Sequence, residues 1–217
     1  MKRTRVKICG ITRLGDARAA VRLGADAIGF VFVPASGRRI ELETARRIAD
    51  ALPSFVARVG LFLDAPREDV EAVLRTIPDL VPQFHGRETA EYCESFGRGY
   101  LKAIGIAGGL PDRSTLDAYA RATGVLLDSH APGELGGTGH AFDWSTLGED
   151  LGKPLILAGG LHAGNVARAI REVTPYAVDV SSGVESAKGI KDEGAMGAFV
   201  TAVARGDVAR TELRVSE

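Results

Sequence analysis

The sequence predicts a single-domain α/β fold, a (β/α)8 barrel of TIM-barrel architecture. Short apolar, β-branched runs alternate with segments of helical periodicity, which is the pattern of repeated βα units and a parallel sheet. Eight such units occur, and their strands begin about every 20 to 30 residues. The length of 217 residues suits one barrel domain. We place the barrel at residues 1–205 and expect residues 206–217, which are polar and charged, to form a loosely held tail.

The individual elements follow from local patterns taken in chain order. The first helix keeps Ala17 and Ala20 at helical spacing and ends where Gly24 can cap it. Pro66 is suited to open the third helix, and Ser114 is a candidate N-cap for the fifth. The predicted strands are residues 6–8, 27–32, 56–62, 80–84, 100–104, 124–128, 155–158 and 177–180. The predicted helices are residues 14–23, 41–52, 67–75, 88–96, 114–121, 165–173 and 195–204.

An open, doubly wound sheet is the alternative architecture. It would normally need a glycine-rich phosphate turn after an early strand. Residues 10–15 have the glycine spacing of a P-loop, but Asp16 stands where that motif has lysine. The barrel is therefore the favoured prediction.

The charge balance argues against polyanionic partners. Lys and Arg total 27 while Asp and Glu total 28, so no net field favours nucleic acid or an anionic membrane. No apolar run of signal-peptide length follows the basic N-terminus, and none approaches the ~20 residues of a membrane span. Two cysteines and four scattered histidines form neither a disulfide framework nor a zinc-like spacing. We expect a cytoplasmic protein without a metal.

Four polar residues lie at or just after the ends of predicted strands, at the end of the barrel where active sites are assembled. Cys9 follows the first strand and Arg38 lies in the loop after the second. His85 follows the fourth strand, and Asp128 ends the sixth. Because Asp128 emerges from an apolar run, desolvation should raise its pKa toward the range of a general acid. Taken alone, Cys9 is more simply explained as a small buried residue.

Two glycine turns mark a candidate anion site. Gly159 and Gly160 follow the seventh strand, and Ser182 and Gly183 follow the eighth. Small residues let backbone N–H groups approach an anion, and barrels often bind phosphate between these two loops. The glycine-rich loop of residues 129–144 is longer than usual connections and is typical of a lid, with an insertion without function as the alternative.

Several longer segments carry a resemblance to a known family. They are KICGIT at 7–12, GADAIGFVF at 24–32 with Pro34, Ser36 and Arg38, QFHG at 83–86, LLD at 126–128, GGTG at 136–139 with FDW at 142–144, LAGGL at 157–161 with Asn165 and Val166, and VDVSSGVE at 178–185 with Gly189, Lys191 and Asp192. They occur in this order over most of the chain, and their combination is highly specific. In these segments the chain resembles phosphoribosylanthranilate isomerase of tryptophan biosynthesis.

The resemblance implies a (β/α)8 barrel that catalyses an Amadori rearrangement of N-(5-phosphoribosyl)anthranilate to 1-(2-carboxyphenylamino)-1-deoxyribulose 5-phosphate, without cofactor or metal. It implies that Cys9 is the general base, Asp128 the general acid and Arg38 the ligand of the anthranilate carboxylate. Because a free thiol is mostly protonated at neutral pH, nearby positive charge should lower the pKa of Cys9. The backbone groups implied in phosphate binding lie near Gly159, Gly160, Ser182 and Gly183.

His85 and Asp179 are further candidates for substrate binding, each with a structural alternative. His85 is more simply a packing or hydrogen-bonding residue. Lys7 lies two residues before Cys9 and so on the same strand face, inside the barrel, where its charge needs a partner. Asp179 on the closing strand is the candidate partner, and we expect an ion pair, with contact to a substrate hydroxyl as the alternative.

The fourth strand departs from the family pattern. Pro82 stands where the family usually has an aliphatic residue, and it removes a hydrogen-bond donor from a strand that should be central. Phe84 replaces a usual leucine. We therefore expect this strand to begin late or to bulge.

Three other functions stay open at this point. A Schiff-base lyase acting on a phosphosugar would use Lys7 or Lys102 as its nucleophile. A dual-specificity isomerase of the histidine and tryptophan pathways is nearer, although the histidine enzyme is expected to carry Asp at the position of Cys9. A barrel that only binds a phosphorylated ligand is the third. We expect a small phosphorylated substrate as the partner, and a monomer, with a homodimer as the alternative.

Overall fold

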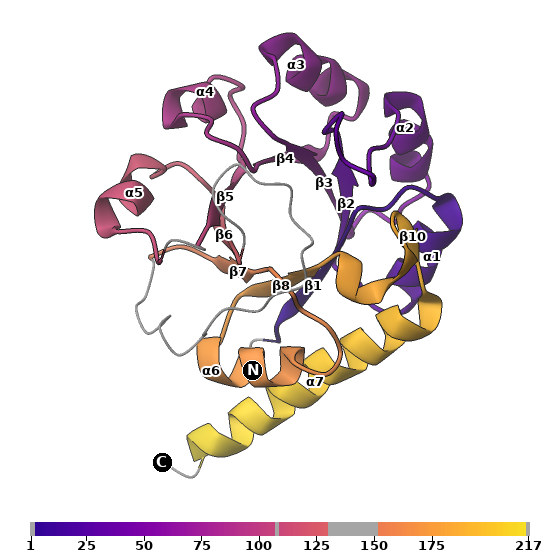
Figure 1. Ribbon diagram of the computed structural model, residues 1–217, viewed down its shortest axis with the longest axis vertical. Coiled ribbons are helices and arrows are strands. Elements are labelled where there is room, and N and C mark those ends of the chain that lie inside the picture. The colour runs from indigo at the N-terminus through magenta and orange to yellow at the C-terminus, as the bar shows by residue number, and fades with distance from the viewer. Residues whose placement is uncertain (1–2, 107–108, 130–151, 216–217) are drawn as a thin grey trace.

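Eight parallel strands close into a barrel in the computed structural model, which describes residues 3–106, 109–129 and 152–215. Each strand pairs with its sequence neighbour, and β1 pairs with β8 to complete the ring seen in Figure 1. The strands are β1 (Arg5–Cys9), β2 (Ala27–Val31), β3 (Ala57–Phe62), β4 (Leu80–Phe84), β5 (Leu101–Gly105), β6 (Gly124–Asp128), β7 (Leu155–Leu157) and β8 (Ala177–Val180). The predicted fold class is confirmed, and each predicted strand differs from the observed one by at most one residue at either end.

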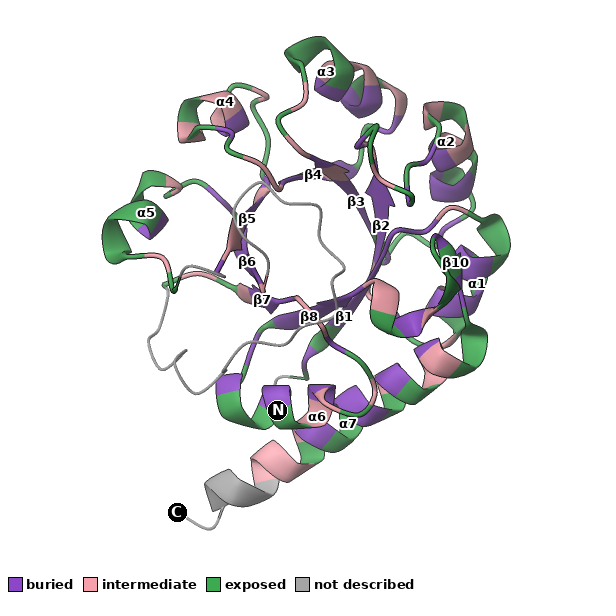
Figure 2. Cartoon of the chain, in the orientation of Figure 1, coloured by how far each residue is buried: buried purple, intermediate pink, exposed green. Residues whose placement is uncertain are grey.

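The helices form a layer outside the strands and bury one face each (Figures 1 and 2). They are α1 (Leu14–Arg22), α2 (Leu42–Asp50), α3 (Arg67–Thr76), α4 (Ala90–Glu94), α5 (Arg113–Ala118), α6 (Val166–Val173) and α7 (Glu193–Val215). In α6 the buried residues are Val166, Ala169, Ile170 and Val173, which share one side of a helix. The main hydrophobic core lies between this helical layer and the barrel.

Helix ends were predicted less accurately than strand ends. Gly24 takes the expected left-handed conformation, with φ of 100° directly after the C-cap Leu23 of α1. The predicted N-cap Ser114 is wrong, because the side chain of Asp112 caps α5 by accepting a hydrogen bond from the Thr115 N–H. A carboxylate satisfies a free N–H of the first turn and also opposes the positive end of the helix dipole.

Pro82 neither delays nor bulges β4, contrary to the prediction. The strand begins at Leu80 and keeps continuous register with β3, where Pro82 lies opposite Gly60. On the other side, β4 pairs with β5 only at Gln83 and Phe84, after the proline. The missing donor is therefore accommodated by a shorter ladder on one side, and the end of the strand that carries His85 is regular.

Three short elements after β8 have no counterpart among the predicted ones. The loop forms a 3-10 turn, η2 (Ser182–Val184), and then an antiparallel hairpin of β9 (Glu185–Ala187) and β10 (Ile190–Lys191). Gly189 takes a φ of 78° in the turn of this hairpin. Strands of two or three residues are too short to give a sequence pattern, so only the structure reveals that Glu185 and Lys191 lie opposite each other.

The predicted tail from residue 206 onward is helical instead, because α7 continues to Val215. Gly206 does not end the helix but is buried where α7 packs on α6, and a Cβ there would lie 3.1 Å from the backbone of Ala167. The next residue, Asp207, accepts hydrogen bonds from the N–H (2.8 Å) and the hydroxyl (2.7 Å) of Thr4. Close packing and these bonds hold a segment that its polar composition alone did not predict.

Two further expectations concern the loop after β6 and membrane-spanning segments. The predicted lid of residues 129–144 lies, apart from Ser129, outside the described residues. In the part of the chain that is described, none of the helices has the length and apolarity needed to cross a membrane.

The bonds of Asp207 give a stability prediction. In Asp207→Ala, Thr4 loses two hydrogen bonds at a site only 2% exposed, so we expect the free energy of unfolding to fall by about 1–3 kcal/mol. Urea denaturation measures this change. Asp117→Ala, which removes an exposed pair with Arg113, should change stability by less than about 0.5 kcal/mol. Equal stabilities of the two variants would contradict the anchoring role of Asp207.

Candidate active site

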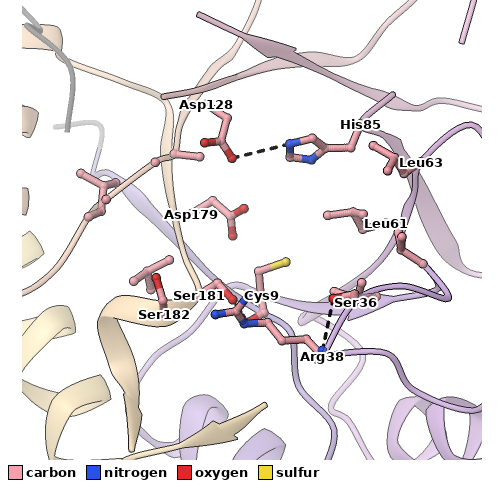
Figure 3. Close-up of a pocket in the computed structure, with 17 residues that line it drawn as sticks. Cys9, Ser36, Arg38, Leu61, Leu63, His85, Asp128, Asp179, Ser181 and Ser182 are labelled. Carbon is pink, nitrogen blue, oxygen red and sulfur yellow. Dashed lines mark hydrogen bonds and ion pairs between the residues drawn. The ribbon is translucent and has the colours of Figure 1, made fainter. Parts of the chain in front are cut away.

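A pocket opens at the carboxyl ends of the barrel strands, and Figure 3 shows side chains from several strands pointing into it. The space between its walls is about 730 Å³, part of it open to solvent. The predicted site residues that line it are Cys9, Arg38, His85, Asp128, Gly159, Gly160, Asp179 and Ser182. Gly183 is not among the lining residues. Its role is steric, because a Cβ there would lie 2.0 Å from the carbonyl oxygen of Leu161.

Cys9 lies at the end of β1 and is only 5% exposed. Gly29 on the neighbouring strand allows this arrangement, since a Cβ there would lie 2.9 Å from the Cys9 Sγ. Burial raises the pKa of the Cys9 thiol above its ordinary value, and the nearby ammonium groups of Lys7 and Lys191 offset only part of that effect. The positive charges act in the expected direction, but the expected net lowering of this pKa is wrong because burial outweighs them. The structure favours a protonated thiol before substrate binds.

Lys7 and Asp179 form the predicted ion pair inside the barrel. The two residues lie opposite each other in the β1–β8 register, with 2.9 Å between Lys7 Nζ and Asp179 Oδ1. Although burial would lower the pKa of Lys7, the carboxylate of Asp179 raises it above its ordinary value. Lys7 is thus held as an ammonium group.

Asp128 ends β6 and faces His85 across the pocket (Figure 3). The distance from Asp128 Oδ2 to His85 Nε2 is 3.6 Å. On the far side of the ring, Gln83 Nε2 lies 3.2 Å from His85 Nδ1, and Gln83 is fully buried. With Gln83 donating to Nδ1, a neutral His85 carries its proton on Nε2, directed at Asp128. Gln83 is a supporting residue whose place on β4, two residues before His85, could have suggested this contact.

The loop that carries His85 is fixed by Glu88. This buried carboxylate accepts hydrogen bonds from the Gly86 N–H and the Asp64 N–H, and it pairs with Lys102 at 2.9 Å. Lys102 Nζ also donates to the Gly86 carbonyl at 2.7 Å. Lys102 therefore braces the end of β4 from outside the pocket lining.

Arg38 reaches into the pocket from the loop after β2, and its stem packs against Gly10. A Cβ on Gly10 would lie 2.7 Å from Arg38 Cδ, and Gly10 also has a φ of 76°. The guanidinium is not unpaired, because Nε and Nη2 each donate at 2.8 Å to the two oxygens of Glu185. The prediction placed Arg38 correctly but missed this partner.

Glu185 is held by two cations, since Lys191 also bonds its Oε1 at 2.8 Å. Burial alone would raise the pKa of Glu185, but the hydrogen bonds from Arg38 and Lys191 bring it below its ordinary value. Both residues belong to the segments that resemble the family, but nothing in the sequence pairs them with Arg38. The hairpin β9–β10 creates that contact.

The opposite end of the pocket is formed by the loops after β7 and β8. Gly159 and Gly160 both take positive φ, 84° and 62°. The side chain of Asn165 fixes this turn: Nδ2 donates to the Gly160 carbonyl at 2.9 Å, and Oδ1 accepts from the His162 N–H at 2.8 Å. These loops present small residues and backbone groups, as an anion site requires.

One wall of the pocket is apolar. Val31, Val33, Leu61 and Leu63 line it and pack around Cys9. Their strand pattern is that of ordinary core positions, so the sequence did not indicate that they line the site. Together with Arg38 they give a surface suited to a planar apolar group that carries a negative charge.

In the described part of the chain, no group of three or more His, Cys, Asp and Glu side chains is arranged to hold a metal ion.

Comparison with known proteins gives one consistent result. A family model described as N-(5'phosphoribosyl)anthranilate (PRA) isomerase matches residues 6–202. The N-(5'-phosphoribosyl)anthranilate isomerase of Pseudomonas fluorescens (strain Pf0-1) is 54% identical over 203 residues, which cover 94% of this chain and 100% of the relative.

Solved structures agree with this result. One, of monomers generated from the dimeric phosphoribosylanthranilate isomerase of Thermotoga maritima, matches with a TM-score of 0.79 and 38% identity. Another, a phosphoribosyl anthranilate isomerase in complex with reduced 1-(o-carboxyphenylamino)-1-deoxyribulose 5-phosphate, matches with a TM-score of 0.80 and 39% identity. In both cases the match covers 93% of this chain and 98% of the other.

The buried thiol gives a prediction on pH dependence. In a Cys93→Ala background, alkylation of Cys9 by iodoacetamide should rise with a midpoint above the ordinary thiol value of about 8.5, because burial disfavours the thiolate. Lys7→Met should raise the midpoint further, since it removes a charge that favours the thiolate. Urea-denatured protein supplies the unperturbed reference. A midpoint below that of the denatured chain would show that the cations outweigh burial.

Proposed function

The chain belongs to the N-(5'-phosphoribosyl)anthranilate isomerase family, and on that basis we propose how its pocket carries out the family's reaction. It is an isomerase of tryptophan biosynthesis that converts N-(5-phosphoribosyl)anthranilate to 1-(2-carboxyphenylamino)-1-deoxyribulose 5-phosphate. One observation carries the assignment of roles: the Cys9 thiol on β1 and the Asp128 carboxyl group on β6 project into one pocket (Figure 3). Acid and base can thus act on one sugar from two positions.

Asp128 is the proposed general acid. The ribose ring opens when its oxygen receives a proton, and a protonated Asp128 can supply it. Asp128 ends β6, is only 7% exposed and lines the pocket. The neighbouring His85 Nε2 orients this carboxyl group, and we assign His85 to positioning and substrate contact.

Cys9 is the proposed general base. Ring opening leaves a protonated Schiff base at C1, and that positive charge makes the C2 hydrogen acidic. The same charge, formed beside Cys9, favours the thiolate that removes this hydrogen, which agrees with a thiol that is protonated at rest. The resulting enolamine gains a proton at C1 and loses the proton of its C2 hydroxyl, which leaves the C2 carbonyl of the ketose product. This sequence uses groups of the chain and the substrate alone, without a cofactor.

The remaining pocket residues orient the substrate. Arg38 would bind the anthranilate carboxylate, and the wall of Val31, Val33, Leu61 and Leu63 would cover the ring. Asp179, beside Cys9, would contact a ribose hydroxyl while it stays paired with Lys7. The groups that would bind the phosphate are those near Gly159, Gly160, Ser182 and Gly183.

Both lysines that a Schiff-base lyase could use as its nucleophile form buried ion pairs. Lys7 is paired with Asp179 and its pKa is raised, so it is a poor nucleophile. Lys102 is paired with Glu88 and does not line the pocket.

For the isomerase we retain the expectations of a cytoplasmic location and a monomer. The Thermotoga maritima relative is described as dimeric, so size-exclusion chromatography is needed for this chain.

The assigned roles predict the effect of two substitutions. Cys9→Ala and Asp128→Asn should each reduce turnover at least about 100-fold, because a general acid or base usually contributes a rate factor of about that size. The fold should be retained in both variants. The fluorescence change during conversion of the anthranilate substrate measures turnover, and circular dichroism checks the fold. Near wild-type turnover in either variant would refute that residue's role.

Growth complementation tests the pathway and the specificity. The wild-type gene should restore growth of a tryptophan auxotroph that lacks this step and should fail in the corresponding histidine auxotroph, because Cys9 occupies the position where the histidine enzyme is expected to have Asp. Cys9→Ala serves as the negative control in the first strain. Rescue of both strains would indicate the dual-specificity alternative.

A further inference from the structure

Three charged side chains from two separate segments meet at the edge of the pocket. Arg38 comes from the loop after β2, while Glu185 and Lys191 come from the two strands of the hairpin β9–β10. The side chains of Arg38, Glu185 and Lys191 are 10%, 6% and 0% exposed. We call these three residues the hairpin cluster. Of the three, only Arg38 lines the pocket.

Glu185 occupies one edge of the Arg38 guanidinium. Nε and Nη2 donate to its two oxygens in a bidentate pair, which fixes the plane of the group. A guanidinium has five N–H groups, so Nη1 and the second N–H of Nη2 remain. Among the described residues, none accepts a hydrogen bond from Nη1. These two nitrogens form a second edge that can bind another carboxylate in bidentate fashion.

Burial lowers the pKa of Lys191 below its ordinary value, although Glu185 opposes that effect, and the polar contacts of its side chain are those of an ammonium ion. Its Nζ lies 2.8 Å from Glu185 Oε1, 3.0 Å from the Ser181 carbonyl oxygen and 3.4 Å from Ser181 Oγ. The Ser181 hydroxyl donates to the Cys9 carbonyl, so its oxygen is available as an acceptor. Three acceptors match the three N–H groups of a protonated lysine.

The charges of the hairpin cluster then sum to +1. Without Lys191, the Arg38–Glu185 pair would be neutral and would offer a carboxylate hydrogen bonds but no net attraction. With it, the buried cluster has one uncompensated positive charge, which is little screened by solvent. The net positive charge of the cluster therefore favours binding of an anion at Arg38, the member that lines the pocket.

We propose that Glu185 and Lys191 are positioning residues for carboxylate recognition: Glu185 holds Arg38 so that its second edge meets the substrate carboxylate, and Lys191 gives the cluster its net positive charge. This inference rests on the proposed function, because it takes the anthranilate carboxylate as the group that Arg38 binds. Neither residue touches the substrate in this arrangement.

Binding of two product analogues to the full-length protein tests the proposal. The first is reduced 1-(2-carboxyphenylamino)-1-deoxyribulose 5-phosphate, and the second has a phenyl group in place of the carboxyphenyl group. Isothermal titration calorimetry gives the ratio of their dissociation constants for each variant. Partial unfolding lowers the apparent stoichiometry for both ligands alike, so the ratio reports carboxylate recognition alone.

Lys191→Met should reduce the preference for the carboxylated ligand at least about 10-fold, because the cluster becomes neutral. Lys191→Arg should largely preserve it. The matched control is Lys188→Met, which removes the same charge from the same hairpin at an exposed position and should change the preference less than about twofold. An unchanged preference in Lys191→Met would overturn the role of Lys191.

Glu185→Ala provides a second, independent variant. Arg38 would lose the bidentate contact that fixes its plane, whereas the net charge would stay at +1 when the unpaired, buried Lys191 sheds its proton, so the preference for the carboxylated ligand should fall through lost positioning alone. A stronger preference would show that Glu185 competes with the substrate for Arg38 and would overturn the proposal. Failure of the wild-type protein to bind either ligand would instead refute the proposed function, and the inference with it.

Discussion

The pairing of β1 with β8 closes the barrel, and the buried ion pair of Lys7 and Asp179 lies in that seam. Removing one partner of such a pair leaves an uncompensated buried charge, which costs about 3–5 kcal/mol, a large part of a typical stability of about 5–15 kcal/mol. The seam also sets the position of Cys9, which follows Lys7 by two residues on the same face. Barrel closure and the site are therefore coupled through one strand.

Desolvation decides the resting state of the Cys9 thiol. Two ammonium groups lie near Cys9, yet the pKa of its thiol is raised because burial outweighs them. Lys7 is itself paired with Asp179, and the negative charge of that carboxylate also raises the pKa of the thiol. A resting thiol that becomes a thiolate beside a cationic intermediate follows from this balance. The reactive form is then present only when there is a proton to remove.

The sequence predicted those features that depend on local pattern. The strands were placed within one residue because eight apolar runs alternate with amphipathic helices, and barrel closure then brings the residues after each strand together. The predicted residues Cys9, Arg38, His85 and Asp128 meet in the pocket for that reason. The N-cap of α5 and the helical continuation beyond Gly206 were mispredicted, because competing cap residues and close helix packing are decided by tertiary contacts.

The partners of the site residues could not be predicted, because they come from short irregular segments. Gln83 supports His85 from a strand position that is buried in any case, and Glu185 approaches Arg38 only because a two-residue strand folds back over the β8 loop. Such contacts depend on a register that no periodicity encodes. The residues that carry out the chemistry lie at predictable strand ends, whereas those that set its charge and orientation lie in the connections. A single hairpin therefore determines whether Arg38 reaches the pocket as part of a neutral pair or of a cation.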